Sequence, residues 1–299
     1  MNPKSPQPPS SRKPAWLRRR MPSGSAFGEV RRMLESGSLH TVCQEARCPN
    51  QGECFSSRTA TFLILGPRCT RACRFCAVEH GPAGPADPDE PARVAGVARE
   101  MGLRYVVITS VTRDDLPDGG ASAFAATIRS VRDALPDAAV EVLIPDFAGD
   151  RDALMTVVEA SPDVLNHNLE TVRRLYAVVR PGADYDRSLS LLKTVRGAAP
   201  AMLTKSGLML GLGETESEVR AAMEDLLSAG CRMLTLGQYL QPTKDHLPVT
   251  RYVTPEEFDR WAETARSLGF AEVAAGPLVR SSYRAGELYQ TCHCSSESA

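Results

Sequence analysis

The chain alternates short apolar runs with longer stretches of helical periodicity, and this alternation constrains its fold more than any other feature. The apolar runs have no polar face, as Val106-Val107-Ile108 illustrates. Such strands must be buried on both sides, as in a parallel sheet covered by helices. The sequence therefore predicts an α/β fold, a full or partial (β/α) barrel. Its expected strands are 61–65, 105–111, 140–145, 163–168, 203–210, 233–238 and 271–275.

The chain is long enough to bury one large core, since it has 299 residues of which 42% are hydrophobic. We expect a barrel core over 59–275, an N-terminal tail and extension over 1–58, and a C-terminal extension over 276–299. Within the N-terminal extension, a short amphipathic helix is expected over 25–36 with Ser25 as its N-cap, followed by a loop over 41–58. Outer-ring helices are expected at 90–101, 119–134, 216–229 and 255–267.

The first residues are basic and free of acids, as in an organellar transit peptide. However, prolines oppose the amphipathic helix that such peptides form, and residues 1 to about 13 are expected to be a disordered tail. The basic run Arg18-Arg19-Arg20 is a candidate contact for the acidic surface of a partner protein, with a solvated arm as the alternative.

Charge and cysteine content exclude several classes of protein. Lys+Arg number 35 against 36 Asp+Glu, so no global field favours nucleic acid or an anionic membrane. No apolar stretch reaches the roughly 20 residues of a membrane span, and the N-terminus lacks the apolar core of a secretory signal. The nine cysteines include six at short spacings, which favours metal ligation over disulfides. We therefore expect a cytoplasmic, bacterial-type enzyme in a reducing compartment, with no nucleic-acid or membrane partner.

Six of the cysteines form two tight triads. The upstream triad has the spacing C-x4-C-x5-C and consists of Cys43, Cys48 and Cys54. The downstream triad has the spacing C-x3-C-x2-C, with Phe75 before its last member, and consists of Cys69, Cys73 and Cys76. Three thiolates in one short loop can hold three irons of a cubane cluster and leave the fourth iron open to a ligand. The downstream triad follows an expected strand, which places it at the mouth of the barrel, and the upstream triad implies a second metal centre.

Alternatives remain open for several metal-ligand candidates. Zinc is the alternative at the downstream triad, because His80 follows Cys76 by four positions and would complete a Cys₃His site. Cys231 precedes an expected strand and is interpreted as a small buried residue. The role of three residues near the C-terminus is left open, because they look like metal ligands but chain ends are usually disordered. These are Cys292, His293 and Cys294.

The downstream triad with its preceding aromatic residue resembles the hallmark of the radical S-adenosylmethionine (SAM) enzymes. In that superfamily SAM fills the open iron site, and its reductive cleavage yields a 5′-deoxyadenosyl radical that abstracts hydrogen from unactivated carbon. Together with the upstream triad, the chain resembles the lipoyl synthase family. The resemblance runs from about Lys13 to Tyr283 and includes 109–116, 166–170, 180–185, 204–207, 211–215 and 238–242.

The resemblance implies an enzyme that inserts two sulfur atoms at C6 and C8 of an octanoyl chain carried on a protein lysine. It implies SAM and two [4Fe–4S] clusters: a radical cluster on the downstream triad and an auxiliary cluster on the upstream triad, which is the sulfur source. The motif Arg280-Ser-Ser-Tyr283 implies a serine ligand of the auxiliary cluster; we expect Ser282, with Ser281 or simple turn hydrogen bonds as alternatives. The expected catalytic residues are thus Cys69, Cys73, Cys76 and Ser282.

The implied partners are the octanoylated lipoyl domains of 2-oxoacid dehydrogenase E2 subunits and of the glycine cleavage H protein. An electron donor such as flavodoxin or ferredoxin is also implied.

Further residues lie where such barrels hold SAM. Glu170 has a structural alternative, since an acid at the start of a helix is favoured by the helix dipole. Arg180 and Lys205 are candidates for the SAM carboxylate, with solvated or helix-terminal roles as alternatives. His167 is expected to pack within a strand. The predicted SAM contacts are Asn168, Glu170, Gly119, Gly120, Arg180 and Lys205.

Two other functions compete with this interpretation. One is a biotin-synthase-like enzyme that inserts sulfur into a free small molecule, which the upstream triad and the Arg280-Ser-Ser-Tyr283 motif disfavour. The other is a zinc-stabilised binding module, which the β/α alternation and the polar segments gathered at one end of the strands disfavour.

Overall fold

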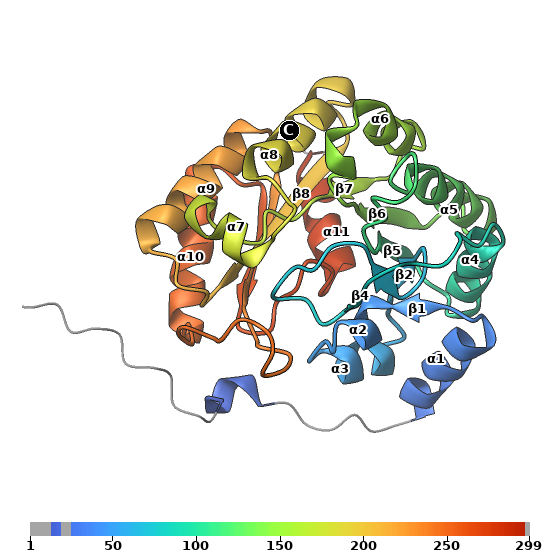
Figure 1. The fold of residues 1–299 in the computed structure, drawn as a ribbon, viewed down its shortest axis with the longest axis horizontal. Helices are drawn as coiled ribbons and strands as arrows, with labels where there is room; N and C mark the ends of the chain where they lie inside the picture. The colour runs from blue at the N-terminus through green and yellow to red at the C-terminus, as the bar shows by residue number, and fades with distance from the viewer. Residues whose placement is uncertain (1–12, 19–24, 297–299) are drawn as a thin grey trace, which may run out of the picture.

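A parallel sheet forms the centre of the computed structural model, which describes residues 13–18 and 25–296 (Figure 1). Its strand order is β1-β2-β5-β6-β7-β8-β9-β10, and every neighbouring pair from β2 to β10 is parallel. The two edge strands β1 and β10 do not pair, so the barrel is open and the partial-barrel form of the prediction is confirmed. The parallel strands are β2 (Thr61–Ile64), β5 (Tyr105–Ser110), β6 (Ala139–Leu143), β7 (Val164–Asn166), β8 (Leu203–Leu210), β9 (Met233–Gln238) and β10 (Glu272–Gly276).

Helices cover the outer face of this sheet (Figure 1). Two of them begin with capping boxes, Thr215 with Glu218 and Thr254 with Glu257, which satisfy the exposed N–H groups of the first turn. The expected outer-ring helices are confirmed, and further helices lie between the strands. They are α4 (Glu90–Glu100), α5 (Ala121–Ala134), α6 (Arg151–Glu159), α8 (Tyr185–Ala198), α9 (Glu216–Ser228) and α10 (Pro255–Leu268). Short elements are η1 (Ala15–Leu17), η2 (Phe147–Gly149), η3 (Arg173–Leu175) and α7 (Tyr176–Val179).

The two faces of the sheet differ in chemistry. Outward-facing side chains such as Val140 and Val142 are fully buried in the core beneath the helices. Glu141 lies between them and therefore faces the barrel interior, where it forms an ion pair with Lys205 of β8. The Lys205 Nζ atom lies 2.9 Å and 3.0 Å from the two carboxylate oxygens, and both side chains are fully buried. The interior is thus polar enough to carry chemistry.

The N-terminal extension adds an edge to the sheet. After α1 (Ser25–Ser36), strand β1 (His40–Thr41) pairs antiparallel with β2, and α2 (Val42–Glu45) and α3 (Gln51–Ser56) follow. The prediction of a loop over 41–58 is therefore wrong. Helices this short cannot be predicted from periodicity, because tertiary packing stabilises them. One such contact joins Phe27 of α1 to Phe55 of α3, whose ring centroids are 5.6 Å apart. Ser25 is the first residue of α1 rather than its N-cap. The division at residues 58 and 275 stays a prediction.

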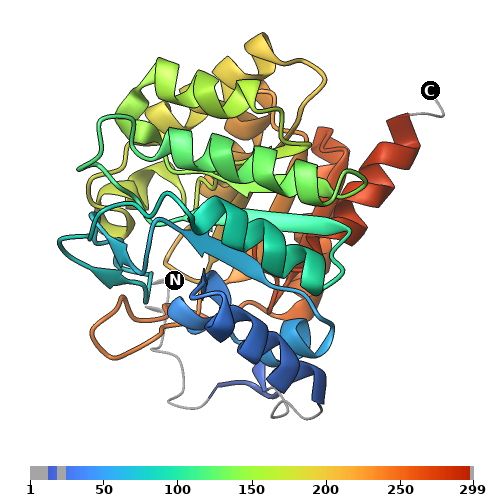
Figure 2. The same cartoon turned by 90° about the vertical axis from the view of Figure 1, so that its right-hand side faces the viewer.

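The C-terminal helix α11 (Ala285–Ser296) covers the end of the barrel at which the parallel strands begin (Figure 2). Cys292 packs against Val164 and Met233, the first residues of β7 and β9, and is buried there. The structure does not describe the side chains of His293 and Cys294. Residues 1–12 of the expected tail and Arg19-Arg20 also lie outside the described residues. Elsewhere Cys231 is 1% exposed, which confirms it as a small buried residue. No helix in the described ranges has the length and apolarity to cross a membrane.

Candidate functional site: two cysteine triads at one cavity

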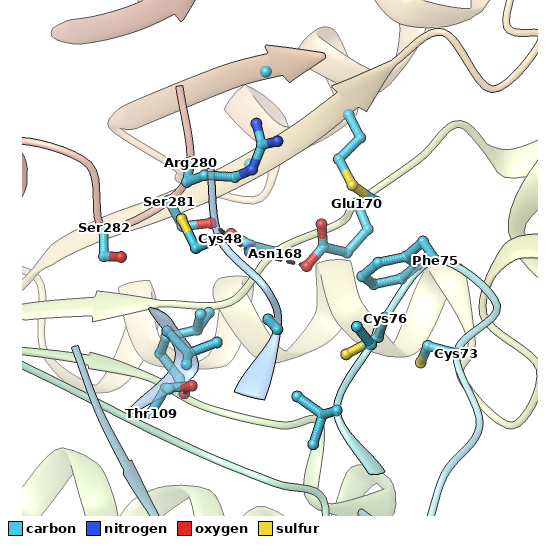
Figure 3. A pocket seen from close by; sticks show the side chains of 18 of the residues that line it. Cys48, Cys73, Phe75, Cys76, Thr109, Asn168, Glu170, Arg280, Ser281 and Ser282 are labelled. Atoms are coloured by element: carbon cyan, nitrogen blue, oxygen red, sulfur yellow. Dashed lines mark hydrogen bonds between the residues drawn. The ribbon is translucent and has the colours of Figure 1, made fainter. Parts of the chain in front are cut away.

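A cavity of about 420 Å³ opens where the parallel strands end. Figure 3 shows Cys73 and Cys76 on one side, Cys48, Ser281 and Ser282 on the other, and Asn168 with Glu170 between them. All three cysteines of the downstream triad line the cavity, whereas the upstream triad contributes only Cys48. Segments far apart in the sequence therefore meet at one site.

The downstream triad sits on a loop that is closed at its base. Strand β3 (Arg68–Cys69) pairs with β4 (Glu79–His80), and the Gly81 N–H donates to the Cys69 carbonyl at 2.9 Å. At the tip, the Cys76 N–H donates to the Cys73 carbonyl at 3.0 Å. The Thr112 N–H, from the loop after β5, donates to the Cys69 sulfur at 3.3 Å. These contacts fix the backbone of the loop that carries the three thiols.

Arg71, within this loop, ties it to two neighbouring loops. Its guanidinium contacts Asp114 after β5 and Asp146 after β6, each at 2.7 Å. The side chains of Arg71 and Asp146 are 9% and 1% exposed, so this is a largely buried ion pair. Burial alone would raise the pKa of Asp146, but the hydrogen bond and charge of Arg71 lower it to about 2. Arg71 therefore fixes the cysteine loop against the sheet.

The segment after β9 holds the loop from the other side. His246 Nε2 lies 2.9 Å from the Cys76 carbonyl oxygen, and because a carbonyl only accepts, Nε2 is the donor. Its Nδ1 then accepts from the Thr243 hydroxyl at 2.8 Å. The Leu247 N–H donates to the Arg74 carbonyl at 3.2 Å. Residues 239–242 of the same segment line the cavity.

The donor set fits an iron–sulfur cluster better than a single ion. Burial raises the pKa of the Cys76 thiol to about 12 and also raises the pKa of Cys73, so iron must displace protons when it binds. Among the described side chains, no three His, Cys, Asp or Glu converge as the ligands of one metal ion do. The Cys₃His zinc site with His80 is accordingly not formed in this part of the chain. Cysteines of a cubane cluster each bind a different iron and are spaced more widely.

Three predicted SAM contacts gather at the cavity. Asn168 Nδ2 donates to Glu170 Oε1 at 2.9 Å, and Arg180 Nη1 donates to the Asn168 carbonyl at 2.9 Å. Within the described structure, the buried Asn168 Oδ1 and Arg180 Nε atoms have no hydrogen-bond partner. An acceptor and a donor left unpaired at a cavity fit a ligand that carries an ammonium and a carboxylate group. Burial raises the pKa of Glu170.

The helix expected directly after Glu170 is wrong, because the next helical segment begins at Arg173. Glu170 instead has a φ of 68° and bridges to Leu208 of β8. His167 packs as expected: its Nδ1 lies 2.9 Å from the Ile144 carbonyl oxygen and its Nε2 lies 3.0 Å from Ser188 Oγ.

The other three predicted SAM contacts are not brought to the cavity. Lys205 lies within β8, and its side chain forms a fully buried ion pair with Glu141. Gly120 precedes α5, and a Cβ atom at this position would lie 2.3 Å from a Leu65 methyl group. A Cβ atom at Gly119 would likewise lie 3.0 Å from the Phe147 ring. These two glycines serve a tight turn, which explains their residue type without a ligand.

The upstream triad is assembled by contacts from distant parts of the chain. Burial, together with the nearby Cys48 and Cys54 thiols, raises the pKa of Cys43 to about 12. Asn50 Nδ2 donates to the Leu278 carbonyl at 2.6 Å, and the Tyr283 hydroxyl donates to Glu53 Oε1 at 2.7 Å. The C-terminal segment thereby docks on the helices that carry the triad.

A glycine of the sheet permits this docking. A Cβ atom at Gly237 would lie 2.1 Å from the Val279 carbonyl oxygen, so any larger residue would displace the segment. The two serines of the segment then point to different partners. Ser281 accepts from Asn168 at 2.6 Å, whereas Ser282 accepts from Thr61 Oγ1 at 2.8 Å. Thr61 also lies beside Cys43, whose pKa its backbone N–H and side chain both lower, so Ser282 and Cys43 share this neighbour.

Sequence reasoning missed several residues that shape this site. Arg71 lies between Cys69 and Cys73, and this position is the only feature of the sequence that could have indicated its role. Glu53 lies inside the upstream triad and Arg280 begins the Arg280-Ser-Ser-Tyr283 motif, but the contact of Glu53 with Tyr283 and the burial of Arg280 near Cys48 and Glu170 are not visible in the sequence. Thr61 and His246 lie outside these motifs and become visible only through tertiary contacts.

An open parallel barrel with a C-x3-C-x2-C loop at its mouth defines the class of protein. The model of the radical SAM superfamily matches residues 63–226, more than half of the chain. Residues 2–48 match the N-terminal domain of lipoyl synthase of the radical SAM family. A lipoyl synthase of Desulfotalea psychrophila is 57% identical over 93% of this chain and 93% of its own length. One of Caldanaerobacter subterraneus is 59% identical over 92% and 96%. The chain belongs to the lipoyl synthase family.

Solved structures agree on the fold. Streptococcus suis SuiB bound to its precursor peptide SuiA has a TM-score of 0.57 at 13% identity, covering 72% of this chain and 48% of SuiB. HydG, a maturase of the [FeFe]-hydrogenase, has a TM-score of 0.54 at 16% identity, covering 85% and 72%. At these identities the likeness concerns the fold alone.

Proposed function

We propose that this chain is a lipoyl synthase that inserts sulfur at C6 and C8 of an octanoyl group attached to a carrier-protein lysine. The observation that carries the proposal is the single cavity that places Cys69, Cys73 and Cys76 opposite Cys48 and Ser282. A radical-generating centre and a sulfur donor must reach the same carbon atoms, and a shared cavity permits this.

The residues divide into a radical side and a sulfur side. Cys69, Cys73 and Cys76 would hold three irons of one [4Fe–4S] cluster, with the fourth iron open to SAM. Cys43, Cys48, Cys54 and Ser282 would hold the auxiliary [4Fe–4S] cluster. When bound, SAM and the radical cluster would supply a hydrogen-abstracting radical, and the auxiliary cluster would supply sulfide.

The polar groups between the two sides suit the ends of SAM. Asn168 Oδ1 is an acceptor for its ammonium group, and Arg180 Nε is a donor for its carboxylate. Glu170, beside Asn168, can accept from the ammonium group or from the ribose. Apolar side chains line the rest of the cavity and would exclude water from an octanoyl chain. They include Leu63, Val111, Leu143, Met209 and Leu240.

The substrate would arrive on lipoyl domains of 2-oxoacid dehydrogenase E2 subunits or on the glycine cleavage H protein, and flavodoxin or ferredoxin would supply electrons. Reconstituting the protein without oxygen, beside a Cys43/Cys48/Cys54 triple alanine variant, tests the proposal. We expect about eight irons per chain in the parent and about four in the variant. Only the parent should convert an octanoyl-lysine peptide to the lipoyl form. Zinc without iron, or equal iron in both proteins, contradicts the proposal.

A further inference from the structure

The geometry points to Thr61 as a positioning residue of the auxiliary iron site, which holds the Ser282 oxygen in place and so sets how firmly the cluster is retained. The inference rests on the proposed function, because Ser282 is a proposed ligand of that cluster. Thr61 belongs to neither cysteine triad nor the Arg280-Ser-Ser-Tyr283 motif.

Thr61 touches proposed ligands from both ends of the chain. It is the first residue of β2 and is 4% exposed. Its hydroxyl donates to Ser282 Oγ at 2.8 Å. Its backbone N–H and its side chain also lie beside the Cys43 thiol, where both lower the pKa of that thiol against the effect of burial. Thr61 therefore joins the N-terminal and C-terminal contributions to the site on one rigid strand.

The contacts around Ser282 leave this role to Thr61. Asn50 and Glu53 bind Leu278 and Tyr283, which fixes the backbone on either side of the serines. Neither contact decides where a serine side chain points, because a serine hydroxyl has three staggered positions. The hydrogen bond from Thr61 selects the staggered position in which the Ser282 hydroxyl points to Thr61. Thr61 also lies beside Cys43.

The same bond distinguishes the two serines of the motif. Ser281 is held by Asn168, on the SAM side of the cavity. Ser282 is held by Thr61, on the auxiliary side. An oxygen ligand is displaced from iron more readily than a thiolate, so a restraint on that oxygen matters more than a restraint on a cysteine. Removing the Thr61 hydroxyl should loosen the auxiliary cluster and leave the radical cluster unchanged.

The test measures iron release to a chelator from reconstituted protein that carries only the auxiliary cluster, in a Cys69/Cys73/Cys76 triple alanine background. Thr61→Val keeps the branched shape and removes the hydroxyl, and Thr61→Ser keeps the hydroxyl as the matched control. We expect release from Thr61→Val to be about tenfold faster, the effect of losing one hydrogen bond, and release from Thr61→Ser to stay within about twofold. Equal release from all three proteins would overturn the inference.

Two further measurements separate this role from a general effect on folding. Thr61→Val should not accelerate release in a Ser282→Ala background, because its partner is already absent there. Equal acceleration in both backgrounds would show that Thr61 acts through Cys43 or the fold, and would overturn the inference. Chelator release from protein that carries only the radical cluster, in a Cys43/Cys48/Cys54 triple alanine background, should not change with Thr61→Val. If the Cys69/Cys73/Cys76 triple alanine protein with Thr61 unchanged binds no iron, the proposed function is contradicted. That result differs from equal iron release in all three proteins, which contradicts only the role of Thr61.

Discussion

The two cysteine triads have the same number of thiols but are held in different ways. The downstream triad lies on one loop, which β3 and β4 close at its base and which Arg71 and His246 fix from two sides. The upstream triad lies on short helices, and its proposed fourth ligand, Ser282, arrives from more than 200 residues away. In the proposed function, the single loop would hold a cluster that survives every turnover. The site assembled from separate segments would hold a cluster that opens to release sulfur.

Removing each triad gives the largest expected effect and separates their roles. The Cys69/Cys73/Cys76 triple alanine variant should neither cleave SAM nor form product, because no iron remains to bind SAM. The Cys43/Cys48/Cys54 variant should still form 5′-deoxyadenosine but no lipoyl product. Chromatography of both products checks this, and loss of SAM cleavage in both variants would show that the two triads are not independent.

Breaking the Arg71 anchor should destabilise the protein. Arg71→Met leaves the carboxylate of Asp146 buried with one fewer cationic partner, although Arg187 remains 3.2 Å away. The free energy of unfolding should fall by about 3 kcal/mol, as for removal of one partner of a buried ion pair. Urea unfolding measures it. The matched control is Arg173→Met, whose pair with Asp186 is 54% and 70% exposed, and whose effect should stay below about 1 kcal/mol.

Removing the His246 contact should weaken the radical side alone. His246→Ala deletes the donor to the Cys76 carbonyl, and we expect SAM cleavage to fall by about tenfold for the loss of one hydrogen bond. His246→Gln, which can donate from its amide, should recover part of the rate. Iron in the auxiliary cluster, measured in the same samples, should not change. A loss from both clusters would mean that the loop after β9 supports the whole cavity.

Loosening the C-terminal segment gives the smallest expected effect, and on the sulfur side only. Tyr283→Phe removes the hydroxyl that donates to Glu53 and keeps the ring. The yield of lipoyl product per SAM cleaved should fall by about threefold, within the range for one partly buried hydrogen bond. The rate of 5′-deoxyadenosine formation should stay constant. An unchanged yield would indicate that Asn50 and Thr61 suffice to dock the segment.

Much of the fold and of the radical site could be predicted because their signals are local. A continuous apolar strand indicates a parallel sheet without reference to distant residues. All the expected strands are present in the structure. The C-x3-C-x2-C spacing fits a cluster loop without any distant partner. The short helices α2 and α3 were missed because their stability comes from packing, not from periodicity.

The predicted SAM contacts show the limit of such reasoning. Asn168, Glu170 and Arg180 line the cavity, but Lys205 does not, because a strand position alone does not reveal a buried carboxylate two strands away in the sheet. Contact of these residues with SAM stays a prediction. Gly119 and Gly120 have positive φ angles of 61° and 92° and lie close to Phe147 and Leu65, so a turn explains glycine at these positions without a ligand, and their contact with SAM stays a prediction.

The sequence by itself determined the sheet, the cluster chemistry and the family, since each depends on residue types at short spacings. Only the tertiary structure decided that Thr61 donates to Ser282 and that Asn168 donates to Ser281. These contacts join β2 and the segment after β7 to a segment beyond β10. They exist because the barrel is open and the C-terminal segment crosses Gly237 to reach the first strand.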